Sequence, residues 1–81
     1  MTKEILIQST SGIHATLASK IVQLSHQYTA DVKLHYNDKV IDIASILGLM
    51  SLAVPEGENI TLVAEGKDAE KVIQAIEKVI G

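Results

Sequence analysis

The apolar residues of this 81-residue chain recur with two different periods, and the alternation between them restricts the possible folds more than any other feature. Four short segments have the period-two pattern of strands with one buried face: residues 3–9, 31–36, 39–43 and 59–65. Residues 15–28 and 69–80 instead have apolar positions every three or four residues, as in amphipathic helices. Residues 44–53 form a short apolar segment that Ser45 can cap as a helix. The predicted order is therefore β-α-β-β-α-β-α.

Turn-forming residues separate these segments. Asn37-Asp38 has the chemistry of a two-residue hairpin turn, and residues 55–57 (Pro-Glu-Gly) form a second turn. Gly66 ends the fourth strand, and Asp68 is expected to cap the last helix. Four strands and three helices with one-sided apolarity predict an α+β open-faced sandwich, in which helices cover one face of a four-stranded antiparallel sheet. Residues 1–81 are expected to form a single domain.

The composition excludes several classes of function. The chain has no Cys, so it can form neither a disulfide nor a thiolate metal site, and it has no cysteine nucleophile. The net charge of -3 argues against a nucleic-acid-binding surface. No apolar run approaches the roughly 18 residues of a membrane span, and the first residues do not resemble a signal peptide, so a cytoplasmic location without membrane insertion is expected. All seven basic residues are Lys, so the planar guanidinium that suits phosphate groups is missing.

Three histidines are candidates for chemistry. His26 and His35 are expected to lie on the surface of a helix and a strand, and neither has a partner at the spacing of a metal site. His14 stands at the junction of a loop and the first helix, where free backbone N–H groups and the helix dipole favour an anion. A histidine in that position can be a nucleophile that takes up a phosphoryl group. The alternative, which the local context by itself favours, is a residue near the cap with no chemical role.

The short apolar helix offers a second candidate region. Ser45 is explained by capping alone, although a phosphate on its hydroxyl would also be tolerated at a helix start. One face of so short a helix cannot bury all of its apolar residues, and we expect some of Ile46, Leu47, Leu49 and Met50 to reach the surface. An exposed aliphatic patch of this kind can dock a partner protein, and ordinary core packing is the alternative.

Two of these segments together resemble the HPr family, the histidine-containing phosphocarrier proteins of the bacterial sugar phosphotransferase system. The resemblance rests on Ser11-Gly12-Ile13-His14-Ala15 with Ala18, and on residues 45–52 (SILGLMSL), and it covers essentially the whole chain. It implies that His14 accepts a phosphoryl group from enzyme I and passes it to enzyme IIA components. It implies no metal and no organic cofactor, and a phosphoryl carrier in place of a conventional enzyme.

The resemblance also assigns roles in the second region. Ser45 matches a regulatory serine that a dedicated ATP-dependent kinase phosphorylates, with a phosphorylase and a transcriptional regulator as further expected partners. Ile46, Leu47 and Met50 match the hydrophobic patch on which partners dock.

The chain departs from the family in the stretch after His14, which reads Ala15-Thr16-Leu17. Thr16 replaces the active-site arginine, and Leu17 replaces a proline. Ala15, Thr16 and Leu17 are the expected supports of the phosphoryl group: the Thr16 hydroxyl can donate one hydrogen bond, and Leu17 restores a backbone N–H that proline lacks. Lys20 lies one turn further on. Its ammonium is a point charge on a flexible stem and lacks the planar shape of a guanidinium.

Two other functions compete with this one. The first is a regulatory protein similar to the Crh branch of the family, acting through phosphorylation of Ser45 with weak or no phosphotransfer, although Crh-like proteins usually lack the histidine that this chain keeps. The second is a ferredoxin-like domain that binds a small ligand, which follows from the predicted fold alone.

Overall fold

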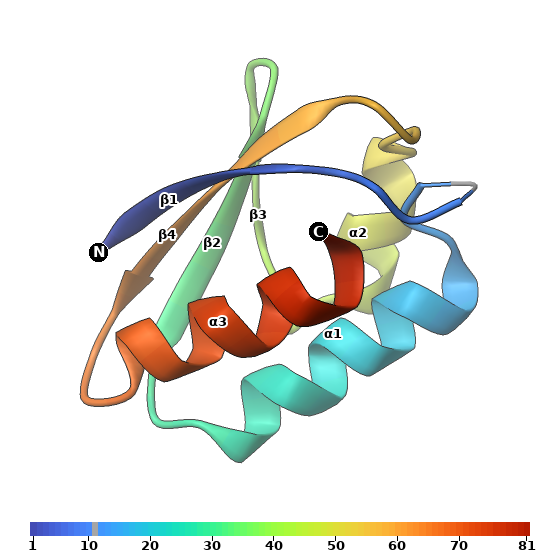
Figure 1. Cartoon of the computed structure of the whole chain (residues 1–81). Helices are drawn as coiled ribbons and strands as arrows, with labels where there is room; N and C mark the ends of the chain where they lie inside the picture. Colours follow the sequence, from blue (N-terminus) through green and yellow to red (C-terminus); the bar gives the residue numbers. More distant parts are fainter. Residues whose placement is uncertain (11) are drawn as a thin grey trace.

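The computed structural model describes residues 1–10 and 12–81, and it has the predicted element order (Figure 1). The strands are β1 (Thr2–Leu6), β2 (Asp31–Tyr36), β3 (Lys39–Asp42) and β4 (Asn59–Glu65), and the helices are α1 (Ala15–Gln27), α2 (Ile46–Leu52) and α3 (Ala69–Ile80). The strands form one antiparallel sheet in the order β1-β4-β2-β3, and the three helices cover one of its faces. The predicted α+β open-faced sandwich is therefore confirmed.

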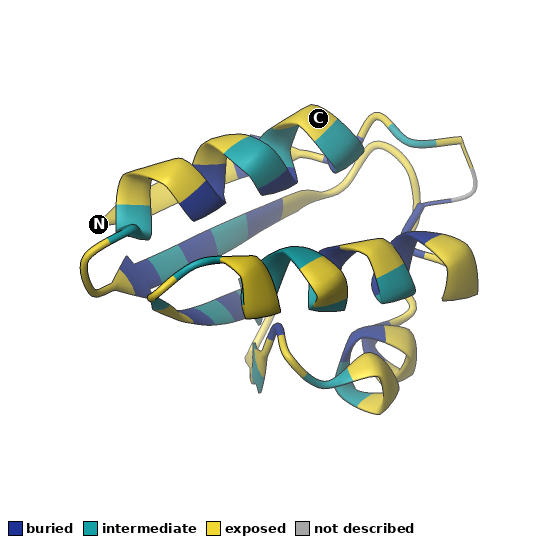
Figure 2. Cartoon of the chain, turned by 90° about the horizontal axis from the view of Figure 1, so that it is seen from below, coloured by how far each residue is buried: buried dark blue, intermediate teal, exposed yellow. Residues whose placement is uncertain are grey.

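The core lies between the sheet and the helices and consists of aliphatic side chains. Along β4 the buried residues are Ile60, Leu62 and Ala64, in strict alternation with more exposed neighbours. The helices turn their own apolar residues toward this layer, and Figure 2 shows the buried positions of α1 and α3 on the sides that face the sheet. No polar or charged residue is buried among those that the structure describes. The core can therefore hold the helices in place, but it contains no group that could perform chemistry.

The helix α2 is placed differently from α1 and α3. It packs against α1 and β3, and it lies at the end of the molecule where α1 begins (Figure 1). Two of its residues, Leu49 and Leu52, are buried and fix it there. The fold thus brings His14 and the 45–52 segment to the same end of the molecule.

Two local predictions differ from the structure. The first strand ends at Leu6 and not at Ser9, because Leu6 pairs with Asn59, where β4 begins. Ile7 bonds to the turn before β4, through its N–H to the Glu58 carbonyl, and the Gln8 N–H donates to the Ile80 carbonyl. Asp68 does stand at the start of α3, but its side chain makes no cap hydrogen bond. Its Oδ2 accepts from the Thr29 N–H at 2.9 Å, because the α1–β2 connection passes close to it. Asp68 therefore joins two loops and does not cap its own helix.

In the part of the chain that the structure describes, no helix has the length and apolarity needed to cross a membrane.

Candidate functional site at the start of helix α1

His14 is the N-cap residue of α1. Its backbone is extended, and its carbonyl accepts the first hydrogen bond of the helix from the Ala18 N–H at 2.8 Å. The imidazole makes no capping hydrogen bond, and the residue is exposed. Within residues 1–10 and 12–81 no hydrogen bond or ion pair holds the ring. Because the residue is exposed, a reactant can reach it from solvent.

The two residues before His14 attach this junction to the body of the protein. Gly12 has a positive φ of 67° and is buried, and its N–H donates to the Ser9 carbonyl at 2.9 Å. Ile13 is also buried, and its N–H donates to the Val54 carbonyl at 2.9 Å. A side chain at Gly12 would place a Cβ 2.1 Å from that same carbonyl oxygen. Only glycine fits here, and the fit fixes where His14 begins the helix. Ser11, which the motif also contains, lies outside the described residues.

The first turn of α1 supplies hydrogen-bond donors beside the imidazole. The first N–H of the helix that donates to a helix carbonyl is that of Ala18. The N–H groups of Ala15, Thr16 and Leu17 precede it and have no acceptor within the helix, as at every helix start. No acidic residue stands in this turn, so no carboxylate of the helix competes for these donors. Leu17 faces the core and is 6% exposed, while Ala15 and Thr16 are exposed. The helix start can therefore stabilise negative charge on an atom attached to His14.

A shallow, open hollow of about 470 Å³ extends along α1 from this turn. It is lined by Ala15, Thr16, Ser19, Lys20 and Gln23. Sequence analysis singled out Thr16 and Lys20 but missed the contribution of Ser19 and Gln23. The positions 16, 19, 20 and 23 follow the i, i+3, i+4, i+7 spacing of one helix face, and that polar stripe was the available signal.

Ser45 caps α2, as predicted. Its Oγ accepts from the Gly48 N–H at 3.0 Å, and its own backbone N–H donates to the Asp42 carbonyl at 3.0 Å. The residue is half-buried. The hydroxyl oxygen thus already works as a helix cap, and any group added to it would sit at the start of α2.

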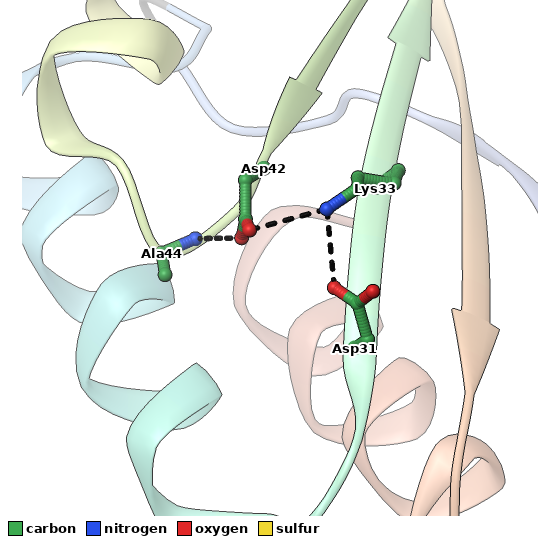
Figure 3. Close-up of polar contacts among 4 residues, drawn as sticks. All are labelled: Asp31, Lys33, Asp42 and Ala44. Carbon is green, nitrogen blue, oxygen red and sulfur yellow. Dashed lines mark hydrogen bonds and ion pairs between the residues drawn. The ribbon is translucent and has the colours of Figure 1, made fainter.

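A small ionic network fixes the segment that leads into Ser45 (Figure 3). Asp42 Oδ1 accepts from the Ala44 N–H at 2.9 Å, and Lys33 Nζ lies 3.2 Å from both Asp42 Oδ2 and Asp31 Oδ1. The hydrogen bond from Ala44 is the main reason that the pKa of Asp42 is lowered, and Lys33 lowers it further. The hydrogen bonds to Asp31 and Asp42 raise the pKa of Lys33.

The apolar residues of α2 divide between the core and the surface. Leu49 is fully buried, whereas Ile46, Leu47 and Met50 are 41%, 82% and 44% exposed. These three exposed residues form what we call the α2 patch. The prediction that part of this segment reaches the surface is confirmed, and the structure decides that Leu49 is the member that does not.

The other two histidines lie away from this region. His26 is exposed in the last turn of α1, and His35 is half-buried in β2. Within residues 1–10 and 12–81 no group of three or more acidic or histidine side chains could hold a metal ion.

Comparison with known proteins agrees with this geometry. The family model described as the PTS HPr component phosphorylation site matches residues 1–81. The phosphocarrier protein HPr of Bacillus anthracis has a similar structure, with a TM-score of 0.95 and 31% identity over 100% of this chain and 96% of that one. HPr-C-His from Thermoanaerobacter tengcongensis matches with a TM-score of 0.92 and 32% identity, covering 99% and 90% of the two chains. The catabolite repression protein Crh of Bacillus subtilis matches with a TM-score of 0.77 and 32% identity, covering 95% and 88%.

The fold and the family match together define the class of this protein as a small phosphocarrier domain. The chain belongs to the HPr family, the phosphocarrier proteins of the phosphotransferase system.

Proposed function

We propose that this protein carries a phosphoryl group on His14, taking it from enzyme I and delivering it to enzyme IIA components in the cytoplasm. The observation that supports this most directly is the state of the His14 side chain, which is exposed and makes no capping hydrogen bond at the start of a 13-residue helix. The Ser45 side chain bonds an opening amide of α2, and the Asp68 side chain bonds the Thr29 N–H, whereas the His14 side chain makes no capping hydrogen bond. The protein is in this role a substrate and donor of phosphoryl groups, with no cofactor and no catalysis of its own.

The transfer is a displacement at phosphorus. A neutral ring nitrogen of His14 attacks the phosphoryl group carried by enzyme I, so a new N–P bond forms while the bond from phosphorus to enzyme I breaks and its electron pair returns to enzyme I. The second nitrogen of His14 keeps its proton, which can pass to solvent afterwards. The arriving group brings about two negative charges. Opening amides of a helix stabilise such charge by about 0.3–1 kcal/mol at an exposed site.

Ala15, Thr16 and Leu17 are the proposed supports of the phosphoryl group, and they differ from the family motif in two ways. Without the arginine, this chain lacks a charge-assisted hydrogen bond of a kind worth roughly 1.5–3 kcal/mol. Leu17 supplies a backbone N–H where the motif has proline, which offsets part of the loss. We therefore expect phosphorylation of His14, with slower transfer than in a protein that keeps the arginine.

Partners are proposed to dock on the α2 patch. It lies on the helix that packs against α1, and it exposes three large apolar side chains together. Adjacent apolar residues with a flexible methionine suit a surface that must fit several partners in turn.

Incubation with enzyme I and phosphoenolpyruvate tests the proposal. The wild-type protein should gain one acid-labile phosphoryl group, and His14→Gln should gain none, while His26→Gln should behave as wild type. No label on the wild-type protein under conditions that label another HPr would refute the carrier function.

A second function is favoured by two observations, and it acts through Ser45. The arginine of the motif is missing, and the Crh protein of Bacillus subtilis, named for catabolite repression, is similar over most of the chain. A kinase that phosphorylates Ser45 would place the phosphate at the α2 cap, beside the α2 patch, where it could change the choice of partner. A kinase with ATP should then give an acid-stable phosphate that Ser45→Ala abolishes. Acid-stable phosphate that persists in Ser45→Ala would exclude this function.

A further inference from the structure

Lys20, which lines the hollow along α1, is the only lysine or arginine of that helix. The helix sequence ATLASKIVQLSHQ has no acidic residue, and Lys20 has no partner of opposite charge three or four positions away. The structure's ion pairs within residues 1–10 and 12–81 involve Lys3 and Lys33 only. Lys20 therefore is an exposed ammonium that no carboxylate of its own helix neutralises.

The direction of the Lys20 side chain matters because helical side chains lean toward the helix N-terminus. A long side chain covers the turn that precedes its own Cα, which for Lys20 is the turn that contains Thr16. The axial separation of these two residues is about 6 Å at 1.5 Å per residue, and the four-carbon stem of lysine is long enough to span it. The ammonium can thus reach the level of the opening amides.

An ammonium near the first turn of α1 is unfavourable unless an anion binds beside it. The start of a helix carries partial positive charge, which repels an ammonium that lies near it. The hollow also presents the hydroxyls of Thr16 and Ser19, and it begins at Ala15, the residue next to His14. The chemistry of the hollow therefore matches the oxygens of a phosphoryl group attached to His14.

Resting on the proposed function, we infer that Lys20, together with the Thr16 hydroxyl, forms a cationic arm that folds over the phosphoryl group of phospho-His14. In this chain the arm takes the place that an arginine two residues after the histidine would occupy, and it approaches from the next turn of the helix. The contact forms only after phosphorylation, because the free imidazole offers Lys20 no negative charge. Lys20 is then a binding residue for the phosphoryl group, and not for enzyme I.

The pKa of the phosphorylated His14 ring, read from its ³¹P shift, is the appropriate measurement, since it does not depend on any partner protein. His26→Gln/His35→Gln protein, in which His14 is the sole histidine, can be phosphorylated chemically with phosphoramidate and titrated by ³¹P NMR. In this background Lys20→Met should raise the pKa of the phosphorylated His14 ring by about 0.2–0.7, because a nearby cation disfavours protonation of the ring. Lys20→Arg should restore the lower pKa.

Lys71→Met is the matched control, because Lys71 is an exposed lysine of α3 outside the hollow. It should leave the pKa of the phosphorylated ring unchanged. An equal pKa in the Lys20→Met and parent proteins overturns the inference, and so does a shift of the same size in Lys71→Met. The carrier function is tested separately: failure of enzyme I to label the protein would refute that function, while the NMR titration would still decide the role of Lys20.

Discussion

At the residue level, Gly12 fixes the path of the backbone two residues before His14. Its φ of 67° lies in the left-handed region, and its α-carbon faces the backbone of Val54 and Pro55. Gly57 also has a positive φ, of 91°, but a Cβ there would meet nothing within 4 Å. Gly12 is therefore required both for its backbone conformation and for the lack of space beside it, whereas Gly57 is required for its conformation alone.

Gly12→Ala is expected to lower the free energy of unfolding by about 2 kcal/mol or more, since the left-handed conformation alone costs about 1–2 kcal/mol and the close contact adds to it. Gly57→Ala should cost only the conformational part, about 1 kcal/mol. Urea denaturation of the two variants measures the difference. Equal losses would show that the contact with Val54 is relieved without cost.

At the scale of the element, the short helix α2 depends on its ends. It has seven residues, and isolated helices of that length are not stable in water. The Ser45 cap, the turn held by Asp42 and the buried Leu49 and Leu52 therefore have to hold it in place.

Ser45→Ala should lower the free energy of unfolding by about 1 kcal/mol, because the Gly48 N–H loses its acceptor. Ser51→Ala is the comparison within the same helix. The Ser51 hydroxyl donates to the Gly48 carbonyl and caps nothing, so its loss should cost less than about 0.5 kcal/mol. Thermal unfolding followed by circular dichroism distinguishes the two, and a larger cost for Ser51→Ala would contradict the assignment of the cap.

The turn before α2 should respond to acid. The pKa of Asp42 is lowered in the folded protein, so its contribution is present above the unfolded value of about 3.9 and is lost as the pH falls through the folded pKa. Because the carboxylate is 48% exposed, solvent screening keeps the effect to roughly 0.5 kcal/mol or less. Lys33 acts in the opposite direction: its raised pKa gives a contribution that is lost only as the pH rises through that folded value.

Urea denaturation at pH 6 and pH 3 tests the role of Asp42. The wild-type protein should lose more stability between these two pH values than Asp42→Asn does. Asp38→Asn, which changes an exposed carboxylate in the β2–β3 turn, should follow the wild type. If the wild type lost no more stability between these pH values than Asp42→Asn, Asp42 would not contribute to the acid response.

At the scale of the whole molecule, the fold separates the core from the surface proposed for recognition. The core side chains form one buried cluster. The helix α2 and the start of α1, which carry the α2 patch and His14, lie together at one end of the molecule (Figure 1). Changes in the patch can therefore alter partner binding without unfolding the domain.

Leu47→Gln tests this separation, since Leu47 is 82% exposed. Its free energy of unfolding should change by less than about 0.5 kcal/mol. Phosphoryl transfer from enzyme I to His14 should slow about fivefold or more if Leu47 is a central contact of the interface. Val40→Thr, at an exposed position of β3, should leave transfer unchanged. Equal rates in wild type and Leu47→Gln would place the docking surface elsewhere.

The type and order of the elements follow from the sequence, because the periods of two and 3.6 are properties of the chain that packing against a common core requires. It also marked His14 and Ser45 as helix starts, since capping depends on neighbours in sequence. The tertiary structure alone decided that Asp68 joins two loops, that Leu49 and not Leu47 is buried, and that Gly12 lies against Val54. These facts depend on contacts between residues far apart in the chain, and no local pattern encodes which distant backbone will occupy the space beside a residue.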